Sequence, residues 1–581
     1  MFYYKPYLQL YDYTTTRTVA FKKHSPLKKY FLFVVLSSFS VGSFGQFKES
    51  QEINKLFKAW NQPNVPGGAI GIIKEGKLIY SKGYGIGDLE HTIKISPSSV
   101  FNISAESQQF ITFSLLLLEE QGKLNLDDTV QKYLPDFPEY NAPLTIRQFI
   151  HHTSGIRHYG ALMHLKGRSN LESLEANEIY ELIKNQKALN SFPGKKFSYS
   201  NSGYFLLTMI IEKVSNQSLN RYAQEHIFGP LGMDNTFFYD NNTALIKNKV
   251  FSYRKKTNEH RFDNLNMRTN RVEAGLIYST IEDLFLWDQN FYNNKLGKGG
   301  QNIIKNMYKE GLLNNGESSG FAYGLRSGTY KGLKEVSNGG RFAGYRSEIL
   351  RFPEENFSVI ILANRGDAIP WTMSYKIADV LLKEKFLAIT KKKENKIDNY
   401  KRTDIKEKFS LKQITGDYEI EPGKLLKITI KNDSLQLEGW VEPLMLINTK
   451  GNTYRAANYP IFKFIFSELK NTSTQKLTVS GPSLKLTSKR KERIDFSTLN
   501  LTDYTGSFYN EEIDATHIFF IEDNQLKVKI ANYDEKRKLA PFDTDIFNSE
   551  NYLVHFTRTN GEINGFELKT YRITHLKFEK I

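Results

Sequence analysis

The sequence predicts an α/β (α+β) domain, in which helices flank an antiparallel sheet, followed by two small antiparallel β-barrel modules. Three observations support this fold class. The chain has 581 residues, which is too long for one ordinary domain. Strand patterns occur early and late in the first 385 residues with helical patterns between them, so one sheet takes strands from both ends of that domain. Beyond residue 408 a strand-rich pattern is repeated at an offset of about 90 residues.

Five segments predict the elements of the first domain. Residues 67–85, GGAIGIIKEGKLIYSKGYG, are typical of two strands joined by a Glu-Gly turn. An apolar helix is expected after Ala105, and it should end at Gly122 because glycine is a good C-cap residue. Residues 144–156 predict a short helix and a turn, and 199–217 predict a helix with a polar start. Residues 347–365 indicate a late hairpin.

The second half of the chain is predicted to hold two copies of one module. ITGDYEI at 414–420 recurs as YTGSFYN at 504–510, and LLKITIKNDSLQLEG at 425–439 recurs as HIFFIEDNQLKVKI at 517–530. Short strands with frequent turn signals are typical of small antiparallel barrels. The predicted divisions are a leader with signal peptide (1–45), the α/β domain (46–385), a charged linker (386–408) and the modules (409–496 and 500–581).

The N-terminal region predicts export. Residues 28–46, KKYFLFVVLSSFSVGSFGQ, place a basic flank before a short apolar core with small residues behind it. The apolar run is short for a membrane span, so a signal peptide cleaved near Gly45 is favoured over an uncleaved anchor. We expect a periplasmic or secreted protein without a transmembrane domain in its mature form.

Charge and cysteine content narrow the function classes. The formal charge is +16, but the lysines are spread among acidic residues and no nucleic-acid-binding motif accompanies them. We interpret most of this charge as solvated surface and expect no nucleic-acid partner. The absence of cysteine excludes disulfides, thiolate catalysis and cysteine-based metal sites. No cofactor and no metal is predicted.

Four short motifs carry the functional signal. They are FNISAESQQF at 101–110, the HHTSGI turn at 151–156, FSYSNSGY at 197–204 and VSNGGRFAGYRSEI at 336–349. Their order and context resemble the serine β-lactamase and penicillin-binding-protein superfamily, nearest to β-lactamase-related serine hydrolases of class-C-like architecture. The resemblance covers roughly residues 50–385 and implies a β-lactamase/transpeptidase-like domain. The two modules resemble the lipocalin-like β domains that often follow such hydrolase domains.

The resemblance implies a set of catalytic positions, of which the first two are replaced here. In the family a serine at a helix start attacks a carbonyl, and a lysine three residues later reaches its hydroxyl. These positions fall on Ala105 and Gln108. The tyrosine and asparagine of the family's Y-x-N motif are retained as Tyr199 and Asn201, which would move protons and hold a substrate amide.

The third motif of the family is a histidine or lysine, then any residue, then glycine, on an edge strand. The resemblance assigns these places to Ser337 and Gly339, so the charged side chain is replaced and the glycine is kept. Gly340 would supply the second backbone N–H of an oxyanion hole, beside that of the nucleophile position. Tyr199, Asn201, Gly339 and Gly340 are the predicted ligand-binding residues.

These substitutions predict a pseudoenzyme. Alanine has no nucleophilic atom, and the amide of glutamine is no useful base near neutral pH. In related enzymes the loss of one member of such a unit already removes most of the rate. We expect a protein that binds a D-amino-acid peptide, a muropeptide or a partner protein. Two alternatives stay open: an atypical serine hydrolase using Ser104, Ser107 or a water, and an envelope scaffold acting through the β modules.

Neighbouring polar residues have simpler interpretations. His151 and His152 are expected to be structural residues of the turn. Glu106 is expected either at the rim of the pocket or as a solvated acid stabilised by the helix dipole.

Overall fold

A computed structural model describes residues 49–168, 172, 175–241, 243–256, 261–265, 276–389, 409–421, 424–440, 443–457, 462–468, 475–481, 484–491, 494–549, 552–570 and 572–581. The predicted signal peptide, its cleavage near Gly45 and most of the predicted linker lie outside these residues. None of the helices in the described ranges is long and apolar enough to cross a membrane.

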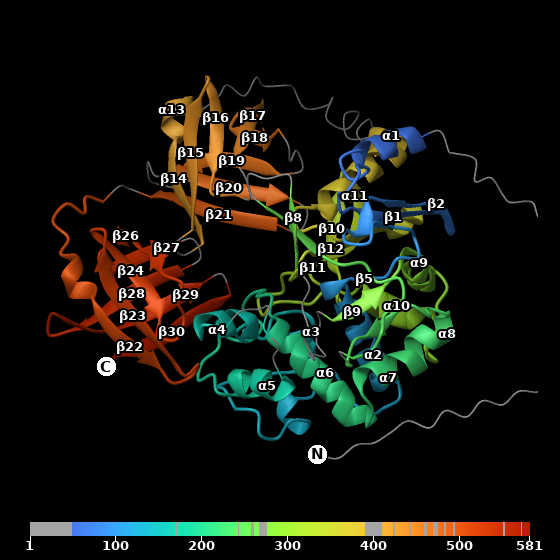
Figure 1. Cartoon of the computed structure of the whole chain (residues 1–581), viewed down its shortest axis with the longest axis horizontal. Coiled ribbons are helices and arrows are strands. Elements are labelled where there is room, and N and C mark those ends of the chain that lie inside the picture. The colour runs from blue at the N-terminus through green and yellow to red at the C-terminus, as the bar shows by residue number, and fades with distance from the viewer. Residues whose placement is uncertain are drawn as a thin grey trace, which may run out of the picture. The chain divides into compact units, whose positions relative to one another are not determined.

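The first domain is built on a six-stranded antiparallel sheet with the order β10-β11-β12-β13-β1-β2 (Figure 1). β1 pairs with β13, so the sheet joins the two ends of the domain as the sequence predicts. The strands are β1 (Gly68–Lys74), β2 (Lys77–Tyr84), β10 (Arg326–Tyr330), β11 (Leu333–Phe342), β12 (Tyr345–Phe352) and β13 (Phe357–Ala363). Both predicted hairpins are confirmed.

Helices cover both faces of this sheet. One face packs against α1 (Ser50–Leu56) and α11 (Pro370–Leu381) through one cluster of buried apolar residues. The other face packs against α2 (Ser107–Glu120), α6 (Asn201–Ser215) and α9 (Ile281–Asn290) through a second, larger cluster. α2 is buried on every side from Ser107 to Leu118, so the helix that starts at the candidate site runs through the core.

Shorter elements complete the domain. The helices are α3 (Ile146–Ile150), α4 (Tyr159–Leu165), α5 (Ala176–Lys184), α7 (Leu219–Ala223), α8 (Gly229–Leu231) and α10 (Gln301–Met307). The short strands are β3 (Ile86–Asp88), β4 (Ile93–Lys94), β5 (Phe101–Asn102), β6 (Phe237–Phe238), β7 (Tyr253–Lys255), β8 (Phe262–Asn264) and β9 (Ile277–Ser279). The helices predicted in 105–122, 144–156 and 199–217 are therefore present, and Gly122 has the left-handed φ of 69° expected after a helix.

The first C-terminal module is a closed eight-stranded antiparallel barrel, preceded by the short helix α13 (Leu411–Ile414). Its strands are β14 (Gly416–Glu421), β15 (Lys424–Lys431), β16 (Ser434–Glu438), β17 (Leu444–Lys450), β18 (Thr453–Ala456), β19 (Lys463–Glu468), β20 (Gln475–Gly481) and β21 (Leu484–Lys491).

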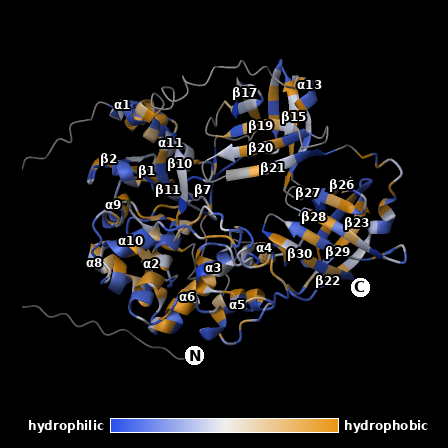
Figure 2. Cartoon of the chain, turned by 180° about the vertical axis from the view of Figure 1, so that it is seen from behind, coloured by the Kyte–Doolittle hydropathy of each residue, from blue (hydrophilic) through white to orange (hydrophobic). Residues whose placement is uncertain are grey.

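The second module is a nine-stranded antiparallel sheet whose two ends, β25 and β26, follow each other in the chain. Its strands are β22 (Gly506–Asn510), β23 (Ala515–Glu522), β24 (Gln525–Ile530), β25 (Arg537–Lys538), β26 (Ala540–Asp543), β27 (Ile546–Ser549), β28 (Tyr552–Thr559), β29 (Glu562–Thr570) and β30 (Ile573–Lys580). Hydrophobic and hydrophilic residues alternate along strands of this module, as a one-sided core requires (Figure 2).

The repeat seen in the sequence has a counterpart in the backbone. Gly416 and Gly506 open the first strand of their modules with φ of 142° and 141°. Side chains rarely adopt this conformation, so glycine at the same place in both copies is a structural requirement. The predicted pair of β-barrel modules is confirmed.

Candidate functional site

The candidate site begins where the chain enters α2. Ala105 lies in a single 3-10 turn, Ser104–Glu106, directly before the helix. Ser104 has a left-handed φ of 51°, and its N–H donates to Oδ1 of Asn102 at 3.0 Å. Such backbone strain in a non-glycine residue is held only where the surrounding structure enforces it, and it is concentrated at functional sites. The strained turn is present although Ala105 offers no nucleophile.

Gln108 takes the place of the family's lysine and contacts the retained tyrosine. It is fully buried on the first turn of α2, and its Nε2 donates to the hydroxyl of Tyr199 at 2.8 Å. The structure therefore brings these two predicted site residues into contact. The contact joins two neutral groups, so it orients Tyr199 without supplying a base.

The retained Y-x-N motif lies at the start of α6. The ring of Tyr199 packs at a tilt of 35° against the ring of His152 with a centroid distance of 4.3 Å, and the N–H of Ser200 donates to Nδ1 of His152 at 3.2 Å. Asn201 is the first residue of α6. His152 is buried, and burial holds its pKa well below the usual value, so the ring is neutral. This agrees with the structural role predicted for His152.

Three solvent-shielded polar atoms of the site have no hydrogen-bond partner among the described residues. They are Oε1 of Gln108, Oδ1 of Asn201 and Nε2 of His152. Buried polar atoms are nearly always paired in native proteins, so each orphan needs an explanation. Two of the three are amide oxygens, which accept hydrogen bonds. The surroundings of Tyr199 are therefore suited to a ligand that brings N–H donors.

The third motif lies on β11, and the structure shifts it by one residue from the sequence prediction. Nδ2 of Asn338 donates to the backbone oxygens of Ala105 at 2.9 Å and Gly324 at 3.0 Å. Successive side chains of a strand point to opposite faces, so Ser337 points away from Ala105 and lies beside Glu335. The position assigned to the histidine or lysine is corrected from Ser337 to Asn338, a neutral amide.

The same shift applies to the predicted oxyanion donor. The N–H of Gly340 donates to Oγ of Ser347 on β12 at 3.0 Å, so it is directed away from the free edge of β11. N–H groups of successive residues point to opposite edges of a strand, which gives the free edge to Arg341. β10 pairs with β11 only as far as Ser337. Arg341 therefore replaces Gly340 as the candidate second donor.

Glycine at two places lets β11 and the segment before β10 approach the start of α2. A Cβ on Gly340 would lie 2.2 Å from the backbone oxygen of Ile103, and one on Gly324 would lie 2.5 Å from the carbonyl carbon of Gln108. Gly339, the glycine that the sequence prediction assigned to this role, faces Glu348 instead. A Cβ on Gly339 would lie 2.4 Å from Oε2 of Glu348. Gly340 therefore allows the close approach of β11 to Ile103.

Glu106 differs from both expectations for it. It is neither at a pocket rim nor solvated, because its side chain is fully buried. Its carboxyl accepts hydrogen bonds from Nε2 of Gln109 at 2.6 Å and from the N–H of Ile349 at 3.0 Å. Burial and the nearby Glu348 raise the pKa of Glu106 well above its usual value. Glu106 therefore joins α2 to β12 and adds no charge to the site.

The buried carboxyl of Glu335, on the far face of β11, gives the first prediction. Burial raises its pKa from 4.5 to about 7. Between these pH values only the folded state holds the proton, so stability falls with rising pH, by up to about 3 kcal/mol. Glu335→Gln should match the wild type near pH 4.5 and exceed its unfolding free energy at pH 8, measured by urea unfolding. The exposed Glu354→Gln is the control, and an unchanged pH dependence in Glu335→Gln would contradict the assignment.

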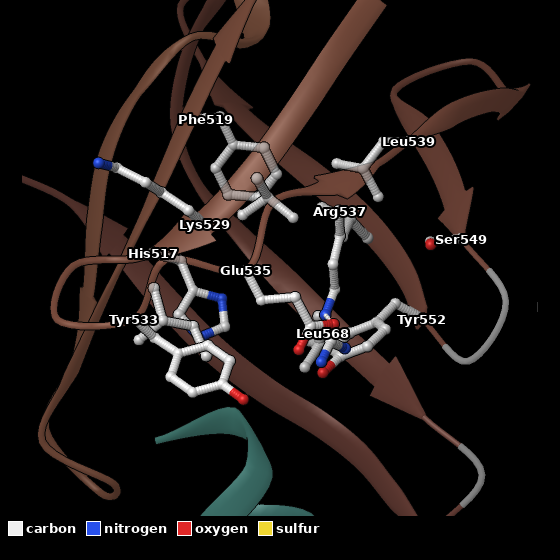
Figure 3. Close-up of a pocket in the computed structure, with 13 residues that line it drawn as sticks. His517, Phe519, Lys529, Tyr533, Glu535, Arg537, Leu539, Ser549, Tyr552 and Leu568 are labelled. Atoms are coloured by element: carbon white, nitrogen blue, oxygen red, sulfur yellow. Dashed lines mark ion pairs between the residues drawn. The ribbon is translucent and has the colours of Figure 1, made fainter. Parts of the chain in front are cut away.

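A separate pocket lies in the second module. Apolar side chains such as Phe519, Leu539 and Leu568 line it together with His517 and Arg537 (Figure 3). Nε2 of His517 contacts the backbone oxygen of Leu165 on α4 at 2.8 Å, and the guanidinium of Arg537 lies 4.3 Å from the ring centre of Tyr552. His517 and Arg537 are thus engaged in packing, and the pocket is distinct from the site at Ala105.

Comparisons with known proteins agree with this architecture. A sequence-family profile described as Beta-lactamase matches residues 53–375. Penicillin-binding protein 4* of Bacillus subtilis is 26% identical over 67% of this chain and 87% of its own length. Protein flp of Staphylococcus aureus is 29% identical over 52% of this chain, which spans 60% of that relative.

A solved structure extends the likeness beyond the first domain. The octameric penicillin-binding protein homologue from Pyrococcus abyssi aligns with a TM-score of 0.52 and 22% identity, covering 84% of this chain and 98% of the other. At this identity the likeness shows the fold alone.

The sequence did not identify Asn338 and Arg341 as site residues. Two consecutive glycines allow two registers for the third motif, and only the direction of the side chains separates them. It also gave no sign of Arg326 and Arg572, whose charges act on His152.

Proposed function

Because the chain belongs to the β-lactamase family, we propose that it is a binding member of that family that has lost hydrolysis. The observation that carries this proposal is the pair Ala105 and Gln108, with Gln108 bonded to the hydroxyl of Tyr199. The nucleophile is missing, and a neutral amide occupies the place of the base. With Asn338 at the third motif, each position that would hold a reactive or charged side chain is neutral.

The retained groups favour a peptide ligand. The unpaired amide oxygens of Gln108 and Asn201 accept hydrogen bonds, and the N–H groups of a peptide donate them. The ligand we propose is a short peptide ending in D-amino acids, such as a muropeptide stem. The names of the relatives from Bacillus subtilis and Pyrococcus abyssi, which refer to penicillin binding, are compatible with this ligand class.

The structure does not favour the alternative of a serine hydrolase that uses Ser104 or Ser107 as its nucleophile. Ser104 is 5% exposed and Ser107 is fully buried, so neither side chain is open to an incoming substrate. Export remains part of the proposal, supported by the basic and apolar pattern of residues 28–46.

Reaction with a fluorescent penicillin tests the loss of hydrolysis. The purified protein should show no covalent label after denaturing electrophoresis, because Ala105 cannot form an acyl bond. Titration calorimetry with N-acetyl-D-alanyl-D-alanine and with its C-terminal amide should show binding without hydrolysis. Stoichiometric labelling of one serine would contradict the loss of catalysis, and binding of neither peptide would contradict the ligand class.

A further inference from the structure

The turn between β29 and β30 of the second module reaches the candidate site. Arg572 in this turn places its guanidinium carbon 4.8 Å from the ring centre of Tyr199. Its Nη1 lies 2.6 Å from Nε2 of His158, just before α4. An arginine from the end of the chain therefore contacts the tyrosine of the Y-x-N motif.

The turn is fixed to the first domain at Arg572 and at Thr574. Nδ2 of Asn190 donates to the backbone oxygen of Arg572 at 2.8 Å, and the N–H of Thr574 donates to Oδ1 of Asn190 at 2.8 Å. Nearby, the buried guanidinium of Arg157 pairs with Glu512 at 2.7 Å. Residues 47–581 form one compact unit, in which one apolar cluster includes residues of both parts. The position of Arg572 is thus set by several independent contacts.

Arg572 contacts the ring of Tyr199 and the imidazole of His158. Burial together with Arg572 holds the pKa of His158 well below the usual value, so the imidazole is neutral. A cation over an aromatic ring and a donor to a neutral nitrogen are both favourable contacts. They hold the guanidinium beside Tyr199.

A second arginine contributes to this field from the first domain. Arg326 is exposed at the start of β10, opposite Ser337. After burial, Arg326 and Arg572 are the largest causes that lower the pKa of His152, whose ring packs against Tyr199. The acids nearest β11, Glu335 and Glu348, are buried on its other face and have raised pKa values. The surroundings of Tyr199 are therefore cationic.

We propose that Arg572 makes the second module part of the ligand site, where its guanidinium binds a carboxylate of the ligand beside Tyr199. This rests on the proposed function and specifies it further. Arginine matches a carboxylate with paired N–H donors, so the ligand should carry a free terminal carboxylate. The first domain supplies the amide acceptors, and the module supplies the anion contact.

Arg572→Ala tests this with the two peptides named above. The wild type should bind N-acetyl-D-alanyl-D-alanine more tightly than its C-terminal amide. Arg572→Ala should weaken binding of the acid roughly 10- to 100-fold, as expected for a lost charge-assisted hydrogen bond, and leave the amide unchanged. Arg558→Ala is the matched control, because Arg558 lies in the same module and pairs with Asp545. It should bind both peptides like the wild type.

The outcomes separate the inference from the proposed function. Equal binding of acid and amide by the wild type, or full acid affinity in Arg572→Ala, would overturn the role of Arg572 and leave the peptide site standing. Binding of neither peptide would overturn both. Arg572→Gln keeps donor groups without the charge, so it should show the same selective loss if Arg572→Ala is too unstable to measure.

Discussion

Ala105→Ser combined with Gln108→Lys is expected to restore covalent reaction with penicillin and slow ester hydrolysis. The new serine would lie at the strained turn before α2, and the new lysine would replace an amide already 2.8 Å from the Tyr199 hydroxyl. A positioned base contributes typically about 100- to 10,000-fold, so the double variant should exceed both single variants by at least about 100-fold. Time-resolved labelling with fluorescent penicillin and hydrolysis of a chromogenic ester measure the effect.

The third motif provides a matched pair of controls for this gain. Asn338→His, added to the double variant, should raise the rate further because Asn338 contacts the backbone of Ala105. Ser337→His should give no increase, because that side chain faces Glu335 on the other side of β11. A larger gain from Ser337→His would contradict the register found here. No labelling of the double variant would mean that the pocket around Ala105 no longer admits a substrate.

Glu512→Ala is expected to lower the free energy of unfolding by about 3–5 kcal/mol, the usual loss when one partner of a buried ion pair is removed. Side-chain exposure of the pair is 0% for Arg157 and 9% for Glu512. The guanidinium of Arg157 also donates to the backbone oxygen of His575 at 2.8 Å, so the remaining charge could not move into water without breaking the docking of the module. Urea unfolding followed by circular dichroism gives the change.

The neighbouring glutamate is the control for this second effect. Glu511 pairs with Lys187, and both side chains are more than 60% exposed. Exposed pairs contribute at most about 1 kcal/mol, so Glu511→Ala should be close to wild type. Similar losses in the two variants would show that the burial of Glu512 does not set the stability of this contact. Because the same contact holds the turn of Arg572, Glu512→Ala should also weaken selection for the peptide acid.

Much of the fold follows from local sequence patterns. The hairpin at 67–85 is encoded by two strand-forming runs and a Glu-Gly turn, whose two residues have φ of 52° and 75°. The apolar run after Ala105 and the glycine at 122 are enough to define α2. The module repeat is visible because each copy repeats the same glycine and strand pattern. These features depend on residues close in the chain, where side-chain periodicity decides the outcome.

The substitution of the first two catalytic positions was also visible in the sequence, since Ala105 and Gln108 have a fixed spacing on one helix. The register of the third motif was not visible in the sequence, because Ser337-Asn338-Gly339-Gly340 fits two registers. Only the packing of β11 against Ile103 and Ala105 selects Asn338 and Gly340. The burial of Glu106 was decided in the same way, by the N–H of Ile349 that its carboxyl meets.

The sequence by itself thus determined the family, the sheet and helices of the first domain, the paired modules, and the loss of the serine and lysine. Tertiary structure decided which side chains face the site and which distant segment joins it. The physical reason is that a residue's identity and spacing are local, whereas the direction of a side chain depends on the surface packed against it. Arg572 is the clearest case, because only the docking of the second module places it over Tyr199.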